Sequence, residues 1–276
     1  MPIGQTTFDL QAHSTYSDGT LAPAEVVARA AAAGVELFAL TDHDTVDGVP
    51  EALAAADGIR VIPAVELSAV DAGHEDLHFL GYALDHTDPA LLATLADFRA
   101  DRVRRIFAMA ERLRSLGLVV EDDALRAHAA PGRPHLADAL LAGNPELAGT
   151  PRDELFARYL VPGAPSYVPR SRPTVPEAIE VIHAAGGLAV WAHPFWDVAE
   201  PEATLDRFAA AGLDGVEAFY VTFTRAQTER LYAAARERGL LTTGSADFHG
   251  PAHERFNRFR AFDLYGLEPD LGRLAA

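Results

Sequence analysis

The sequence contains no cysteine and no lysine, and both absences narrow the chemistry that it can support. Without cysteine there can be no disulfides, thiolate nucleophiles, cysteine-ligated zinc or iron–sulfur clusters. All 23 basic residues are arginine, which excludes catalytic Schiff bases and the lysine of a phosphate-binding loop. Any metal ion must therefore be held by histidine, aspartate or glutamate side chains.

Long apolar segments and positive charge are also scarce. Although 49% of the residues are hydrophobic, no apolar run approaches the roughly 20 residues of a membrane-spanning helix. The N-terminus lacks the basic flank and apolar stretch of a secretory signal, so we expect a soluble, cytoplasmic protein without a membrane partner. The formal net charge of −17 disfavours binding to long nucleic acid, and any phosphate recognition must be local.

Strand-like segments alternate with alanine-rich helical segments over most of the chain. The strand-like segments are Phe8–His13, Glu36–Thr41, Arg60–Ser68, Leu77–Leu84, Gly187–Ala192, Gly215–Tyr220 and Leu240–Ala246. Helical segments between them include Pro23–Ala33, Thr174–Ala185, Pro201–Ala211 and Thr224–Arg238. This alternation predicts an α/β protein with a mostly parallel sheet. Seven strands indicate a barrel one short of eight, and 276 residues suit one barrel with an insertion.

The strand pattern stops between about Asp88 and Pro165. Long helical patterns replace it at Leu91–Leu116, His135–Leu141 and Arg152–Leu160. We therefore expect a helical insertion within the barrel.

Side chains that can bind metal lie on or directly after six of the predicted strands. They are His13, His43, Glu66, His78, His193, Asp247 and His249. In parallel α/β folds the carboxyl ends of the strands meet on one face, where active sites form. Imidazole and carboxylate ligands suit Zn, Mn or Fe(II), and ions about 4 Å apart can hold the oxygens of a transferring phosphoryl group. The pattern therefore predicts phosphoester hydrolysis.

Individual histidines carry less weight than the set. One histidine near a strand end is more often a structural hydrogen-bonding residue than a ligand. Here, however, six predicted strands each place a possible ligand at the same end of the barrel, which we call the rim. His78 lies early in its strand and would reach this rim only if that strand runs antiparallel or bends. The remaining histidines are expected on the surface (His74, His86, His128 and His253) or in a capping or packing role (His183).

Several motifs along the chain resemble those of the PHP family, the polymerase and histidinol phosphatase domain. They are Asp9-Leu-Gln-Ala-His13-Ser-Thr-Tyr-Ser-Asp18-Gly, Thr41-Asp-His43-Asp-Thr45, Val65-Glu66, His78, Ala192-His193-Pro194 and Ser245-Ala-Asp247-Phe-His249. The resemblance implies a distorted seven-stranded (β/α)7 TIM-like barrel formed by residues 1–87 and 166–276. The helical insertion would span residues 88–165 and contribute to substrate binding.

The resemblance also implies a centre of two to three divalent metal ions. The first ion would be held by His13, Glu66 and Asp247 with a contribution from Gln11, the second by Glu66, His78 and His193, and the third by Asp18, His43 and His249. Most family members have histidine where this chain has Gln11. A glutamine carbonyl suits a hard ion such as Mn²⁺ better than Zn²⁺. We therefore expect Mn²⁺ first, Zn or Fe as alternatives, and a third ion that binds more weakly.

The segment Gly132-Arg133-Pro134-His135 resembles stand-alone phosphoesterases that act on nucleoside 3′,5′-bisphosphates and short oligonucleotides. By this resemblance Arg133 and His135 would bind substrate phosphate and join Glu66 in catalysis; Arg suits this role because its planar guanidinium can bind phosphate in bidentate fashion. A structural alternative is an exposed turn before a helix that has Pro134 in its first turn. Tyr167 is also shared with this branch and is expected to pack.

The resulting hypothesis is hydrolysis of a phosphate monoester on a small nucleotide. The substrate would be the 3′-phosphate of a nucleoside 3′,5′-bisphosphate or a short oligoribonucleotide, attacked by a metal-bridged hydroxide. Two alternatives remain. The chain could be a histidinol-phosphate phosphatase, or it could be a regulatory domain that binds nucleotide or metal without turnover.

Overall fold

The computed structural model describes residues 6–276 apart from residues 72, 129, 171 and 197. Seven strands form one sheet in chain order: β1 (Phe8–Asp9), β2 (Leu37–Leu40), β3 (Arg60–Asp71), β4 (His74–Tyr82), β5 (Leu188–Trp191), β6 (Gly215–Tyr220) and β7 (Leu241–Ser245). β1, β2 and β3 pair in parallel, as do β5, β6 and β7. β4 is antiparallel to both of its neighbours. His78 therefore lies near the same end of the barrel as the other candidate ligands, as the sequence analysis requires of an antiparallel strand.

The first and last strands lie side by side, so the sheet nearly closes into a barrel. The Leu10 amide donates to the Gly244 carbonyl over 3.2 Å, and Ala12 forms a parallel bridge with Phe248. The predicted seven-stranded barrel is therefore confirmed. β1 is shorter than expected because the chain after Asp9 makes only isolated bridges of this kind instead of a continuous ladder.

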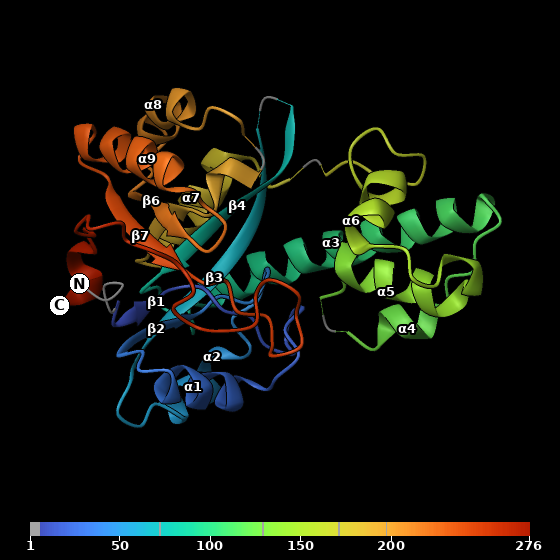
Figure 1. Cartoon of the computed structure of the whole chain (residues 1–276), viewed down its shortest axis with the longest axis horizontal. Coiled ribbons are helices and arrows are strands. Elements are labelled where there is room, and N and C mark those ends of the chain that lie inside the picture. The colour runs from blue at the N-terminus through green and yellow to red at the C-terminus, as the bar shows by residue number, and fades with distance from the viewer. Residues whose placement is uncertain (1–5, 72, 129, 171, 197) are drawn as a thin grey trace.

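Helices cover the outside of the barrel (Figure 1). They are α1 (Pro23–Ala32), α2 (Val49–Ala54), α7 (Val175–Ala184), α8 (Glu202–Ala210) and α9 (Arg225–Glu237). Reciprocal capping boxes start α7 at Thr174 and Glu177 and start α9 at Thr224 and Gln227, which satisfies free backbone amides at both helix ends. Among these barrel helices α2 has no counterpart in the sequence prediction, because six residues are too few to show helical periodicity.

The segment between β4 and α7 is helical and extends to one side of the barrel (Figure 1). It contains α3 (Pro89–Ser115), α4 (Asp122–Arg126), α5 (Arg133–Gly143), η1 (Pro145–Leu147), α6 (Arg152–Leu155) and the π-helical turn η2 (Phe156–Leu160). Its helices bury a separate apolar cluster that includes Met109, Leu113 and Tyr167.

Helix α3 contributes to both apolar cores. Near its start, Leu91, Leu95 and Phe98 pack into the large barrel core with β-strand residues such as Trp191. Further along, Leu113 packs in the core of the insertion. Because α3 packs into the barrel core near its start and into the core of the insertion near its end, this helix fixes the position of the insertion relative to the barrel. None of the helices in the described residues is long and apolar enough to cross a membrane.

We predict that Leu113→Ala lowers the free energy of unfolding by about 2–5 kcal/mol, because it opens a cavity in a fully buried site. Leu116→Ala is the matched control at the end of the same helix. Leu116 is 50% exposed, so its truncation should change stability by no more than about 0.5 kcal/mol. Urea unfolding measures both variants, and equal losses would contradict a separate packed core in the insertion.

Candidate active site

A single buried carboxylate, that of Glu66, lies at the centre of the predicted rim. One oxygen, Oε2, lies 3.0 Å from His13 Nε2 and accepts a hydrogen bond from Gln11 Nε2 over 3.0 Å. The other oxygen, Oε1, lies 2.7 Å from His78 Nδ1 and 3.2 Å from His193 Nε2. Residues from β3, β4 and the ends of β1 and β5 therefore converge on one side chain.

Two further carboxylates surround this centre. Asp247 Oδ1 lies 3.2 Å from His13 Nε2, and Asp18 Oδ1 lies 3.5 Å from His13 Nδ1. His43 Nε2 and His249 Nε2 each lie 3.6 Å from an oxygen of Asp18. The structure thus brings together all nine residues that the sequence analysis nominates as metal ligands: Gln11, His13, Asp18, His43, Glu66, His78, His193, Asp247 and His249.

The donor atoms of this cluster fit divalent cations. Three overlapping groups have ligand atoms that all lie within 4.8 Å of one another: His13, Asp247 and His249; His13, Asp18 and His43; and His43, Glu66 and His78. Several of these buried atoms, including His13 Nε2, His78 Nδ1 and Asp247 Oδ1, lie within 3.2 Å of an oppositely charged group but form no hydrogen bond of normal geometry with any described residue. Buried polar atoms without partners are costly, and shared cations would satisfy them.

The carboxylates are ionised and ready to act as ligands. Burial opposes ionisation of Asp18, but the nearby imidazoles of His43 and His249 hold its pKa well below the ordinary value. Burial likewise opposes ionisation of Glu66, and His43 and His78 hold its pKa well below the ordinary value. At neutral pH the cluster therefore offers negative oxygens beside imidazole nitrogens.

The backbone is strained where the strands deliver these residues. Asp44, His193 and Asp247 have positive φ angles of 53°, 30° and 52°, a region that residues other than glycine rarely occupy. Gly19 ends the turn after His13, and a Cβ there would lie 2.2 Å from the His13 carbonyl oxygen. Strain of this kind persists where surrounding structure holds it, and it is concentrated at functional sites.

The aspartates beside His43 hold the surrounding loops. Asp42 accepts hydrogen bonds from the Ser14 amide over 2.7 Å and from Ser17 Oγ over 2.6 Å. Ser17 Oγ in turn lies 3.2 Å from His13 Nδ1. Asp42 therefore positions His13 through the turn that follows β1.

Four arginines form a basic wall between the insertion and the barrel, which we call the arginine wall: Arg102, Arg105, Arg133 and Arg170. Arg102 Nε donates to Asp44 Oδ2 over 2.7 Å, and Arg133 pairs with Asp76 on β4. The Nε of Arg170 lies 3.8 Å from Asp76.

The arginine wall carries more positive charge than its carboxylates neutralise. Arg102, Arg105 and Arg170 are buried, yet Arg105 forms no ion pair with any residue that the structure describes. Arg105 Nη2 and Arg170 Nε also lack hydrogen-bond partners among the described residues. Buried cations with free donors attract an anion, and phosphate oxygens are well matched to arginine.

His135 lies beside this wall in the first turn of α5. Its Nδ1 accepts a hydrogen bond from the Gly132 amide over 2.9 Å, which leaves Nε2 as the protonated nitrogen. Burial lowers the pKa of His135 to about 4, so the ring is neutral at pH 7. Its ring stacks on that of the partly buried His128 at a centroid distance of 3.8 Å.

Comparisons with known proteins agree with this geometry. The model of the PHP domain matches residues 9–125. A 5′-3′ exoribonuclease of Haemophilus influenzae is 36% identical over 88% of this chain and 90% of its own length. A 3′,5′-nucleoside bisphosphate phosphatase of Chromobacterium violaceum is also 36% identical, over 88% of this chain and 87% of its own. The chain belongs to the PHP family. The resemblance seen in the sequence is therefore confirmed.

A solved structure supports the same assignment. A Bifidobacterium adolescentis protein assigned as a metal-dependent phosphoesterase has a TM-score of 0.82 and 31% sequence identity to this PHP protein. The match covers 95% of this chain and 93% of the other. The two folds therefore agree over nearly the whole length of both chains.

Gln11, which the sequence analysis expects to contribute to the first metal, uses both ends of its side chain in hydrogen bonds. Its carboxamide nitrogen donates to Glu66, while its oxygen accepts a hydrogen bond from Ser245 Oγ over 3.3 Å. The oxygen that was expected to contribute to the first metal therefore faces Ser245 in this arrangement. Rotation of the amide by half a turn would exchange the two atoms.

Glu217 belongs to the site but is absent from the sequence prediction. It is fully buried on β6, accepts a hydrogen bond from the His193 amide over 2.9 Å, and has its Oε1 2.5 Å from Ser245 Oγ. Burial raises its pKa to about 8. Every residue of β6 is buried. A single glutamate in such an apolar segment of the sequence is unusual, and this was the signal that could have identified Glu217 as a site residue.

The titration of Glu217 makes stability depend on pH. The folded protein keeps this proton up to about pH 8, whereas the unfolded chain loses it near the ordinary pKa of 4.5. Its stabilising contribution is complete below pH 4.5 and is lost as the pH rises to about 8. Between pH 4.5 and about 8, the free energy of unfolding of the wild type should therefore fall by a few kcal/mol relative to that of Glu217→Gln, the order of magnitude that this pKa shift implies.

Urea unfolding at a series of pH values in chelator-containing buffer checks this prediction. The exposed Glu237→Gln variant is the matched control and should follow the wild-type curve. A constant difference between wild type and Glu217→Gln across the range would contradict the predicted protonation of Glu217.

Proposed function

We propose that this PHP protein is a metal-dependent hydrolase that removes a phosphate monoester from a small nucleotide. The proposed substrate is the 3′-phosphate of a nucleoside 3′,5′-bisphosphate, with short oligoribonucleotides as further substrates. The observation that carries the proposal is the buried cluster of imidazoles and carboxylates around Glu66, which lies near an arginine wall with excess positive charge. Relatives named as a bisphosphate phosphatase and an exoribonuclease support the same chemistry.

The ligands of two to three divalent ions are part of the proposal. Glu66, His13 and Asp247 would hold one ion, and Glu66, His78 and His193 would hold a second. Asp18, His43 and His249 would hold the third. Bound ions would lower the pKa of a water ligand and neutralise charge on the phosphate oxygens. We expect Mn²⁺ as the preferred ion, with Zn or Fe as alternatives.

The side chains of this protein would bind and orient the phosphates. Arg133 and the neutral His135 lie at the start of α5, where backbone amides and the helix dipole favour an anion. Arg105 and Arg170 add free buried donors on the same wall. A substrate with a second phosphate would use these donors while its scissile phosphate lies at the Glu66 cluster.

Two alternatives predict different behaviour. A histidinol-phosphate phosphatase would use the same cluster but would have no need of a wall that binds a second phosphate. A regulatory domain would bind nucleotide or metal without releasing phosphate. The relatives named as an exoribonuclease and a bisphosphate phosphatase favour an enzyme.

Replacement of the central carboxylate tests the catalytic role of the cluster. Glu66→Gln keeps the shape but removes the charge shared by His13, His78 and His193. We expect loss of bound metal and a fall in kcat of roughly 100-fold or more. The assay measures phosphate release from a nucleoside 3′,5′-bisphosphate, histidinol phosphate and a short RNA, each with Mn²⁺ and with chelator.

Glu111→Gln on the exposed surface of the insertion is the matched control and should behave as wild type. Fast release from histidinol phosphate alone would favour that alternative. No metal-dependent release from any ester by the wild type would refute the proposed function.

Loss of Arg133 tests the second-phosphate role of the arginine wall. For Arg133→Ala we expect KM for a nucleoside 3′,5′-bisphosphate to rise about 10- to 100-fold, the effect of losing a charge-assisted hydrogen bond. KM for the corresponding 3′-monophosphate should change much less. Arg104→Ala, an exposed substitution on α3, is the control. Equal effects on both substrates would argue against a distinct site for the second phosphate.

A further inference from the structure

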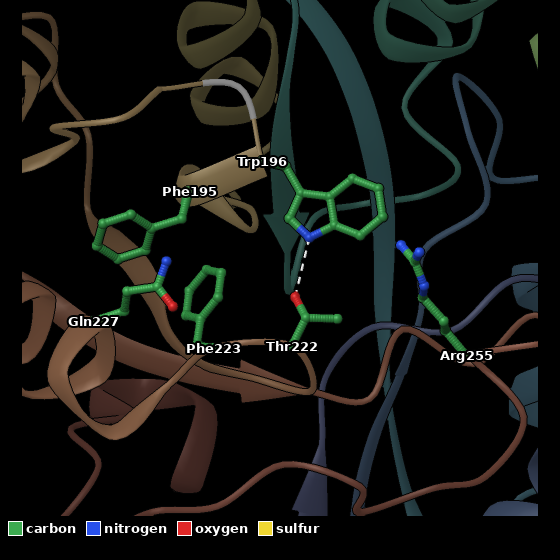
Figure 2. Close-up of a pocket in the computed structure, with 6 residues that line it drawn as sticks. All are labelled: Phe195, Trp196, Thr222, Phe223, Gln227 and Arg255. Atoms are coloured by element: carbon green, nitrogen blue, oxygen red, sulfur yellow. Dashed lines mark hydrogen bonds between the residues drawn. The ribbon is translucent and has the colours of Figure 1, made fainter. Parts of the chain in front are cut away.

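Aromatic side chains line a hollow formed by residues that follow three of the barrel strands (Figure 2). It has a volume of about 290 Å³ and is lined by Phe195, Trp196, Thr222, Phe223, Gln227 and Arg255. These residues come from the turn after β5, the loop before α9, the first turn of α9 and the loop after β7. We call this hollow the tryptophan hollow.

Trp196 is exposed but held in place. It is 48% exposed and is the one aromatic residue among the exposed large hydrophobic side chains of the described chain. Its Nε1 donates to Thr222 Oγ1 over 3.2 Å, and its ring packs on Phe256 at a centroid distance of 5.7 Å. A rigid exposed indole can stack on a ligand with little loss of side-chain entropy.

The tryptophan hollow shares a wall with the cluster. Trp196 follows His193 by one turn of chain, and the two rings lie 6.0 Å apart between centroids. Phe256, which supports the indole, also contacts His249 at 5.4 Å. A ligand bound at the cluster can therefore reach the indole without crossing buried core.

The edges of the hollow are polar. Gln227 uses its carboxamide oxygen to cap α9 at Thr224, so its nitrogen faces no partner among the described residues. Arg255 lies on the opposite side of the indole in Figure 2 and pairs with Asp153 of the insertion at 2.8 Å. The surface thus combines a flat aromatic face with hydrogen-bond donors and one cation, as sites for single bases do.

We propose that the tryptophan hollow binds the nucleobase of the substrate by stacking on Trp196, which makes Trp196 a specificity-determining residue. This inference rests on the proposed function, because it takes the scissile phosphate to lie at the Glu66 cluster. The volume suits one base and not a longer chain, and the net charge of −17 disfavours an extended nucleic acid. Stacking tolerates any base, so the four bases should bind with similar affinity.

Kinetics with and without a base test the inference. The substrates are adenosine 3′,5′-bisphosphate and its abasic analogue, in which hydrogen replaces the base. Trp196→Ala should lower kcat/KM for the nucleotide by roughly 10- to 100-fold and leave the abasic substrate unchanged. Trp196→Phe, which keeps an aromatic face, should retain most of the activity. Equal wild-type rates on both substrates, or an equal loss on both in Trp196→Ala, would overturn the inference.

Fluorescence gives a readout that does not depend on turnover. The chain has two tryptophans, and Trp191 is fully buried, so a bound base should quench Trp196 selectively. Titration of the wild type with AMP should quench emission, and Trp196→Phe should abolish the change. An unaltered wild-type spectrum at saturating AMP would overturn the base site. Absence of phosphate release from both substrates would instead refute the proposed function, while quenching by AMP would still support the base site.

Discussion

The buried carboxylate of Glu66 is the interaction on which the rest of the site depends. An isolated charge in a dry interior costs far more free energy than a typical protein can spare, so it must be surrounded by donors or cations. Here His13, His78, His193 and Gln11 meet its two oxygens. Because these residues come from different strands, the barrel must nearly close before the charge is compensated, and the site and the fold stabilise each other.

The insertion extends this constraint outward. Helix α3 is buried in both cores, and two barrel aspartates, Asp44 and Asp76, pair with Arg102 and Arg133 across the junction. The arginine wall is thereby positioned by Asp44, which directly follows His43, and by Asp76, which lies two residues before His78. An acidic protein can in this way keep a local excess of positive charge between its insertion and its barrel.

Much of the barrel is readable from periodicity, and the exceptions have physical causes. The strand types, the helical insertion and the antiparallel requirement for His78 all follow from local patterns. Helix α2 is too short to show a period, and β1 ends early because its residues pair in isolated bridges. Glu217 could not be predicted as a site residue, because a single carboxylate within an otherwise apolar strand forms no motif and has no characteristic spacing.

The sequence by itself determined the available chemistry: with neither cysteine nor lysine, the ligands had to be imidazoles and carboxylates, and motif order identified the family. Only the tertiary structure decided which atoms share a cation-sized space, that the Gln11 oxygen faces Ser245, and that Trp196 flanks the cluster. The physical reason is that residue type and period are local properties. The distances between strand ends depend on how the whole chain is packed. The same is true of the hydrogen-bond donors that remain without a partner once the arginines have paired with carboxylates.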